Sequence, residues 1–175
     1  MRNLAKIVLA VGIVVQTHGL QAAKASHPSV QEPGDVDERT LQNARFLIRT
    51  AAAHVPIVLA SAPPDGATQG VEGWTTFGET GRGEQIFVYT ESETFRCART
   101  TREFQCLLKL ASIIVHEAWH FMNGRDEAGA YQEQMAFLVL NGASDLQMSG
   151  VGAAGRLLVA AQRKARQART DEKRR

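Results

Sequence analysis

Four stretches of the chain are predicted to be helical, and in the first two of them apolar residues recur at three- and four-residue intervals, as amphipathic helices require. The first stretch is residues 37–53, and Pro56 prevents its continuation. The clearest is residues 106–122. Its apolar stripe consists of Leu107, Leu110, Ile113, Ile114 and Ala118. Residues 126–140 form the third, and an Asn-Gly stop signal follows both it and the second. Residues 152–167 are a last helical candidate, whose charge grows towards its end.

Two short runs have the composition of strands. Residues 85–90 read QIFVYT, where β-branched and aromatic side chains run together, and residues 57–60 form a second apolar run. Residues 61–83 are rich in Gly, Pro, Thr and Ser and are expected to be mostly turns. A chain of 175 residues with 44% hydrophobic content is normally one domain with a core. The pattern therefore predicts a small α+β domain, in which a mainly helical body packs on a short sheet.

The amino terminus has the pattern of an export signal. Arg2 and Lys6 precede an apolar run at residues 7–15, and Ala-Lys-Ala at residues 23–25 offers a cleavage site. The apolar run is too short to span a bilayer, and no other window is long enough. We therefore predict that residues 1–25 are a signal peptide and that the mature protein is periplasmic or extracellular, without stable membrane insertion. An uncleaved anchor or a buried helix is the alternative.

The rest of the chain divides into three parts. Residues 26–34 contain two prolines and no apolar periodicity, which predicts a linker. Residues 35–167 form the predicted domain. Residues 168–175 contain four basic residues against two acidic ones, and a solvated, disordered tail is favoured over an arm that binds anionic surfaces.

Net charge gives no indication of a nucleic-acid partner. The chain has 20 Lys and Arg against 18 Asp and Glu, a net charge of +2. Residues 1–25 hold three of the basic residues and no acidic one, so the remainder carries 17 against 18 and a net charge of −1. The positive sign belongs to the signal peptide, and we expect no binding of nucleic acid.

The two cysteines, Cys97 and Cys106, are nine positions apart. In an oxidising compartment they can form a disulfide that closes a short loop. In the chain-entropy model, this bond would stabilise the folded state by about 2.7 kcal/mol. A disulfide is therefore predicted, with buried free thiols as the alternative. A zinc role is least favoured because the chain has no CxxC pair.

The candidate chemistry lies in His116-Glu117-Ala118-Trp119-His120, inside the clearest helix. Four residues advance an α-helix by about 400°, so both imidazoles stand on one face and can reach one metal ion. A catalytic zinc site has three protein ligands and leaves one position for water. Glu117 is placed to accept a proton from that water as general base. The pattern predicts that His116 and His120 bind Zn²⁺.

The third ligand is found by elimination. No histidine follows His120, which leaves carboxylates. A helix beginning at Asp126 and packed antiparallel on the motif helix brings its first turns level with the two histidines, which favours Glu127. Glu133 and Asp126 are the alternatives, with Asp145 or an upstream residue behind them. Asp126 is more often a helix cap, and Glu133 a solvated helix residue.

The segment HEAWHFMNGRDEAGAYQEQ resembles the active-site segment of zincin metallopeptidases, and most nearly that of glutamate-zincin-like exported bacterial proteins. In these, a glutamate on the helix after HExxH completes the zinc site. The resemblance covers residues 116–134 with the preceding strand and helix. It implies that His116, His120 and Glu127 are ligands and that Glu117 is the base. In well-known gluzincins, however, the glutamate comes much later in the sequence.

The resemblance also implies that the strand at residues 85–90 lines the cleft, where it could pair with an extended peptide; a purely structural strand is the alternative. Tyr131 follows Glu127 by one helical turn on the same face, where its hydroxyl can hydrogen-bond the oxyanion of the reaction; core packing is the alternative. The sequence thus predicts a zinc-dependent metallopeptidase that acts on a peptide or protein substrate. The alternative is a non-catalytic zinc-binding or interaction module of the cell envelope.

Overall fold

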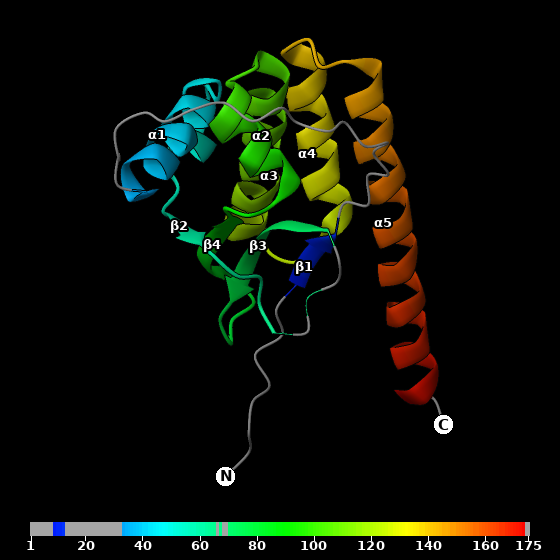
Figure 1. Cartoon of the computed structure of the whole chain (residues 1–175). Coiled ribbons are helices and arrows are strands. Elements are labelled where there is room, and N and C mark those ends of the chain that lie inside the picture. The colour runs from blue at the N-terminus through cyan, green and yellow to red at the C-terminus, as the bar shows by residue number, and fades with distance from the viewer. Residues whose placement is uncertain (1–8, 13–32, 66, 68–69, 174–175) are drawn as a thin grey trace.

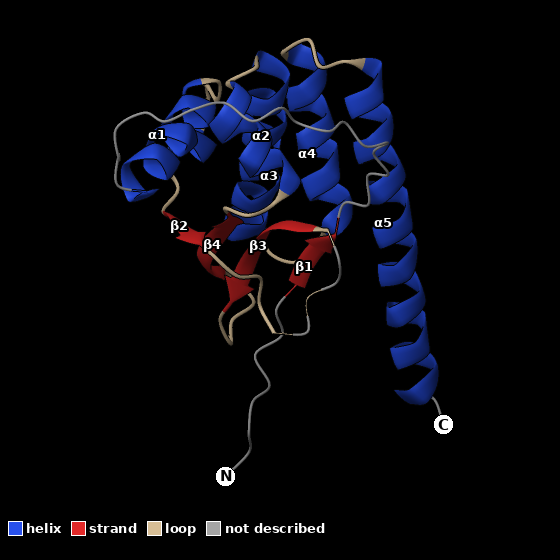
Figure 2. Cartoon of the chain, in the orientation of Figure 1, coloured by secondary structure: helices blue, strands red, loops and turns tan. Residues whose placement is uncertain are grey.

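The computed structural model describes residues 9–12, 33–65, 67 and 70–173, and it has an α+β fold in which helices predominate (Figure 2). In Figure 1 the sheet lies at one end of a group of helices. The elements are β1 Leu9–Gly12, α1 Pro33–Phe46, the 3-10 helix η1 Ala51–His54, β2 Ile57–Ala60, β3 Val71–Phe77, β4 Gly83–Tyr89, α2 Glu93–Thr101, α3 Phe104–Asn123, α4 Glu127–Leu140 and α5 Asp145–Lys173.

The sheet is mixed, with strand order β1-β3-β4-β2. β3 pairs antiparallel with β1 and with β4, while β2 pairs parallel with β4. β4 therefore lies inside the sheet and its backbone groups are used on both sides. The expectation that the strand at residues 85–90 pairs with a peptide is wrong, because β2 and β3 already occupy its two edges.

β3 was missed by the sequence pattern, which predicts turns over residues 61–83. Most residues of β3 favour strands, but Glu72 and Gly73 interrupt the pattern and the flanking segments are rich in turn residues. Pairing with β4 and packing on α3 stabilise the strand. A Cβ atom at Gly73 would lie 3.0 Å from Ile113 and 3.3 Å from Glu117. The glycine thus allows β3 to lie directly against the helix that carries the motif.

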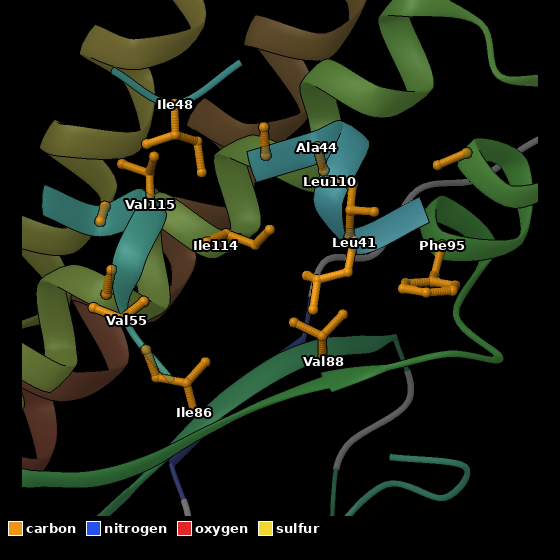
Figure 3. Close-up of a cluster of buried hydrophobic side chains, with 14 residues drawn as sticks. Leu41, Ala44, Ile48, Val55, Ile86, Val88, Phe95, Leu110, Ile114 and Val115 are labelled. Atoms are coloured by element: carbon orange, nitrogen blue, oxygen red, sulfur yellow. The ribbon is translucent and has the colours of Figure 1, made fainter. Parts of the chain in front are cut away.

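The main core fills the space between α1, α2, α3 and β4 (Figure 3). Ile86 and Val88 point up from β4 towards Leu41 of α1 and Ile114 of α3. Burying each such side chain contributes about 1.5–3 kcal/mol. A second cluster joins α3, α4 and α5. It consists of Leu108, Tyr131, Leu138, Val151 and Ala154. The motif helix α3 contributes to both clusters and is therefore the rigid centre of the fold.

A disulfide joins Cys97 of α2 to Cys106 of α3, with 5.7 Å between the Cα atoms, as the spacing predicts. Arg102 between the helices takes the left-handed conformation (φ 55°) and reverses the chain. This bond is compatible with an exported protein. Within the described part of the chain, no helix is both long and apolar enough to cross a membrane.

Two helix boundaries differ from the pattern. α1 begins at Pro33, inside the expected linker, because proline is well suited to the first helical position. It also ends at Phe46 rather than continuing to residue 53, and the separate turn η1 follows.

At the other end of the chain, the sequence predicts a disordered tail over residues 168–175, but α5 continues to Lys173. The chain beyond Gly155 contains neither glycine nor proline and is rich in alanine, arginine and glutamine, which are good helix formers. Residues 174–175 lie outside the described residues.

The predicted signal peptide and linker are mostly outside the described residues. Their described parts are Leu9–Gly12, which forms β1 beside β3, and Pro33, which starts α1. In the register of this pair, Leu9 lies opposite Thr75.

Candidate metal centre

His116 and His120 stand one turn apart on α3, with their ring centroids 4.9 Å from each other. Glu127 in the first turn of α4 faces both rings. Its carboxylate oxygens lie 3.6 Å from Nε2 of His116 and 3.4 Å from Nε2 of His120. One ligand atom from each of the three residues lies within 4.8 Å of the other two, so this buried group can hold a metal ion.

The short connection between α3 and α4 places Glu127 at this point. Three residues separate the end of α3 from the start of α4, and Gly129 lets the two helices approach closely. A Cβ atom at Gly129 would lie 2.2 Å from Cζ2 of Trp119. Of the other candidates for third ligand, Asp126, Glu133 and Asp145 are all exposed, and none belongs to the buried group. Among the described residues, only Glu127 therefore completes the set with the two histidines.

The polar atoms around this group fit a bound cation. The four side chains His116, Glu117, His120 and Glu127 are each at most 4% exposed. Nε2 of both histidines and Oε2 of Glu127 nevertheless have no hydrogen-bond partner among the described residues. Buried polar atoms are costly when they are left without partners. A metal ion bound between them would satisfy all three at once, since it accepts the lone pairs of both imidazoles and of the carboxylate.

His120 is held in the tautomer that a metal ligand needs. Its Nδ1 lies 2.7 Å from the carbonyl oxygen of Gly124, to which Nδ1–H donates. This leaves the lone pair on Nε2, the atom that faces Glu127. A backbone carbonyl bonded to the distal nitrogen commonly orients a metal-binding histidine.

Gly124 has φ 93° and ψ −154°, a conformation open essentially to glycine alone. We expect Gly124→Ala to destabilise the protein by about 1–3 kcal/mol. It should also weaken zinc binding roughly tenfold, because the carbonyl that orients His120 shifts. Thermal unfolding and zinc titration would measure both effects.

The matched control is Gly142→Ala, at another positive-φ glycine after α4, where an added Cβ atom would meet no other atom within 4 Å. It should reduce stability and leave zinc affinity unchanged. Equal zinc affinities in the two variants would contradict the orienting role of Gly124.

Burial and nearby opposite charges shift the pKa values of Glu127 and His120 in opposite directions. Burial would raise the pKa of Glu127, but its interaction with the nearby imidazoles of His116 and His120 outweighs burial and lowers this pKa to about 2. Burial would lower the pKa of His120, but Glu127, Glu117 and the Gly124 carbonyl outweigh it and raise this pKa above 6.5. In the metal-free protein His120 and Glu127 thus favour an ion pair that a metal has to replace.

We therefore expect zinc affinity to fall as pH decreases, beginning above pH 6.5, because a proton on His120 competes with the metal. Competition with a chelating dye between pH 6 and 8 would measure this. In the metal-free protein, by contrast, the contribution of His120 to folding stability should increase as pH decreases. Its stabilisation by protonated His120 is full below pH 6.5 and is lost as pH rises through the raised pKa.

For Glu127 the change of stability with pH has the opposite direction to that for His120. Its lowered pKa gives stability above about pH 4.5 that is lost as pH falls towards 2. The metal-free protein should therefore gain most from this pair between about pH 4.5 and 6.5. A zinc affinity that does not change between pH 6 and 8 would contradict the arrangement.

Glu117 lies beside the metal-binding group and is held from β3. The hydroxyl of Thr75 donates to its Oε2 at 2.8 Å, whereas Oε1 has no partner among the described residues. Burial raises the pKa of Glu117 above 4.5, against the opposing effects of both histidines and of Thr75. Sequence reasoning missed Thr75 because it missed β3, and no short motif marks this residue.

Tyr131 packs against the other side of the group. Its ring centroid lies 4.6 Å from that of His116, and its buried hydroxyl has no hydrogen-bond partner among the described residues. Burial and then the charges of Glu127 and Glu117 raise its pKa, so the hydroxyl keeps its proton and remains a donor. The structure thus brings together all five residues that the sequence singled out: His116, Glu117, His120, Glu127 and Tyr131.

No family model, curated protein or solved structure matches this chain. Function has to follow from the chemistry of the metal-binding group and its surroundings.

Proposed function

We propose that this protein is a zinc-dependent metallopeptidase, similar in its active-site helix to glutamate-zincin-like proteins. One observation carries the proposal: two imidazoles and one carboxylate converge in a buried group, with a second carboxylate, Glu117, beside it. Two histidines and one acidic residue form a ligand set that zinc uses in hydrolases, with the fourth position open. The signal-like amino terminus and the disulfide support export to the periplasm or the extracellular space.

Glu117, Thr75 and Tyr131 would each have a separate role in peptide hydrolysis. Bound zinc would polarise the scissile carbonyl and acidify a water molecule. Glu117 accepts a proton at Oε1 and returns it to the leaving nitrogen, while Thr75 fixes the other oxygen. Its raised pKa makes it a stronger base than an exposed glutamate. Tyr131 has a free hydroxyl hydrogen to donate to the substrate oxygen as negative charge develops there.

A peptide substrate is supported by the edge of β3. An extended segment, β1, already pairs antiparallel with this strand, and Leu9 of β1 lies opposite Thr75, which bonds Glu117. An extended peptide can add to a strand in the same way through main-chain hydrogen bonds. When residues 1–25 are removed on export, as we propose, β3 becomes the edge strand beside the catalytic glutamate.

The test is cleavage of a fluorogenic peptide library by purified protein, with and without a chelator. We expect cleavage that the chelator stops and that added zinc restores. Cleavage that persists in the chelator would exclude the zinc mechanism. Zinc binding without any cleavage would instead favour a non-catalytic zinc-binding module, an alternative supported by the near-complete burial of the ligands.

A further inference from the structure

A groove of about 670 Å³ lies between α4 and α5. Its apolar lining includes Met135 on α4 and Val151 and Val159 on α5, and two arginines, Arg156 and Arg163, line it from α5. α5 runs beside α4 and extends past the rest of the helices (Figure 1). The groove therefore combines apolar side chains with two cationic groups.

The two arginines share one side of α5 and are not neutralised. They are seven residues apart, which is two helical turns. Neither has an ion-pair partner among the described residues, and no acidic side chain lines the groove. The sequence of α5 between residues 146 and 170 contains no Asp or Glu. The groove consequently carries positive charge on its α5 side, which is complementary to an anionic ligand.

The groove begins at the candidate metal centre. Tyr131, which packs on His116, forms part of its lining, and so does Ala128, the residue after Glu127. Gly155 allows α5 to lie against Tyr131, since a Cβ atom there would approach the tyrosine ring to 2.9 Å. The groove and the metal-binding group thus lie on two sides of Tyr131, which contacts both.

We propose that this groove binds an acidic segment of the peptide substrate, with carboxylates paired to Arg156 and Arg163 and an apolar side chain against Val151 and Val159. The proposal rests on the peptidase function above. Arginine suits this task because its planar guanidinium pairs with a carboxylate through two parallel hydrogen bonds. The apolar lining favours such a peptide over a generic polyanion, which would interact with the arginines through charge alone.

Binding can be tested without turnover. The full-length Glu117→Gln variant is titrated with two fluorescent peptides of equal length, one containing Glu beside Leu and one with Gln in place of Glu, and anisotropy is recorded. We expect the acidic peptide to bind about five- to tenfold more tightly, with a preference that declines with salt. Arg156→Gln combined with Arg163→Gln should remove this preference. Equal binding of the two peptides would overturn the proposal.

Lys164→Gln is the matched control, because it removes the same charge from an exposed position on α5 that does not line the groove. It should keep the preference for the acidic peptide. Loss of the preference in this variant as well would show a general charge effect and overturn the site. Tighter binding of single-stranded RNA or of anionic lipid vesicles than of the acidic peptide, through the same two arginines, would also overturn it.

The two proposals fail in different ways. If wild-type protein cleaves both peptides with equal kcat/KM, the groove proposal fails and the peptidase remains. If the acidic peptide binds preferentially but is never cleaved, the groove stands as a binding site and the peptidase proposal fails. If both hold, the double variant should raise KM for the acidic peptide about five- to tenfold with kcat unchanged, since it removes only uniform binding.

Discussion

We expect Glu117→Gln to remove the proposed peptide cleavage and to leave the proposed zinc site occupied. Glutamine keeps the shape of the side chain and the hydrogen bond with Thr75, but it cannot accept a proton. Loss of a general base typically costs about 10²–10⁴-fold in rate. The measurement is kcat/KM on a cleaved library peptide, together with the zinc content of the purified variant. Since burial already disfavours the charged form of Glu117, the neutral variant should unfold at no lower temperature than wild type.

Glu133→Gln is the control for this experiment, because Glu133 is exposed on α4 and outside the metal-binding group. It should retain full activity. Undiminished cleavage by Glu117→Gln would remove this residue from the mechanism. Loss of zinc from the variant would instead make Glu117 a metal ligand.

The second large effect is expected at Glu127. Zinc at about a thousand times its dissociation constant should stabilise the wild-type protein by about 4 kcal/mol. This corresponds to a rise in Tm of roughly 8–16 °C for a chain of this size. Glu127→Gln replaces the charged ligand by a neutral amide and should weaken zinc binding at least about 100-fold, so at the same zinc concentration the stabilisation falls to about 1.4 kcal/mol or less and the rise in Tm to roughly 3–6 °C or less. Differential scanning calorimetry with and without zinc measures it.

Asp126→Asn and Glu133→Gln remove the two carboxylates that the sequence left as alternatives. Both positions are exposed, and both variants should keep the wild-type thermal shift with zinc. A full zinc shift in Glu127→Gln, or its loss in either control, would show that the third ligand is elsewhere.

The chain's local patterns determined the motif helix and its neighbour. The apolar stripe of residues 106–122 predicts α3 closely, and the four-residue spacing of His116 and His120 follows from helix geometry alone. The Asn-Gly signals at residues 123–124 and 141–142, with Asp126 as a candidate N-cap, likewise indicate α4, and with it the approach of Glu127. These features depend on contacts between residues that are close in sequence, which a periodic pattern records.

Tertiary structure alone decided the features that depend on distant residues. β3 forms through its pairing with β4 and its packing on α3, so Thr75 meets Glu117 across 42 positions of sequence that no local pattern connects. The depth at which the ligands are buried, and the exposure of Asp126 and Glu133, depend on how α4 packs on α3 around Gly129. The groove between α4 and α5 exists because the two helices pack side by side. Helix propensity does not predict which side chains of one helix face those of the other.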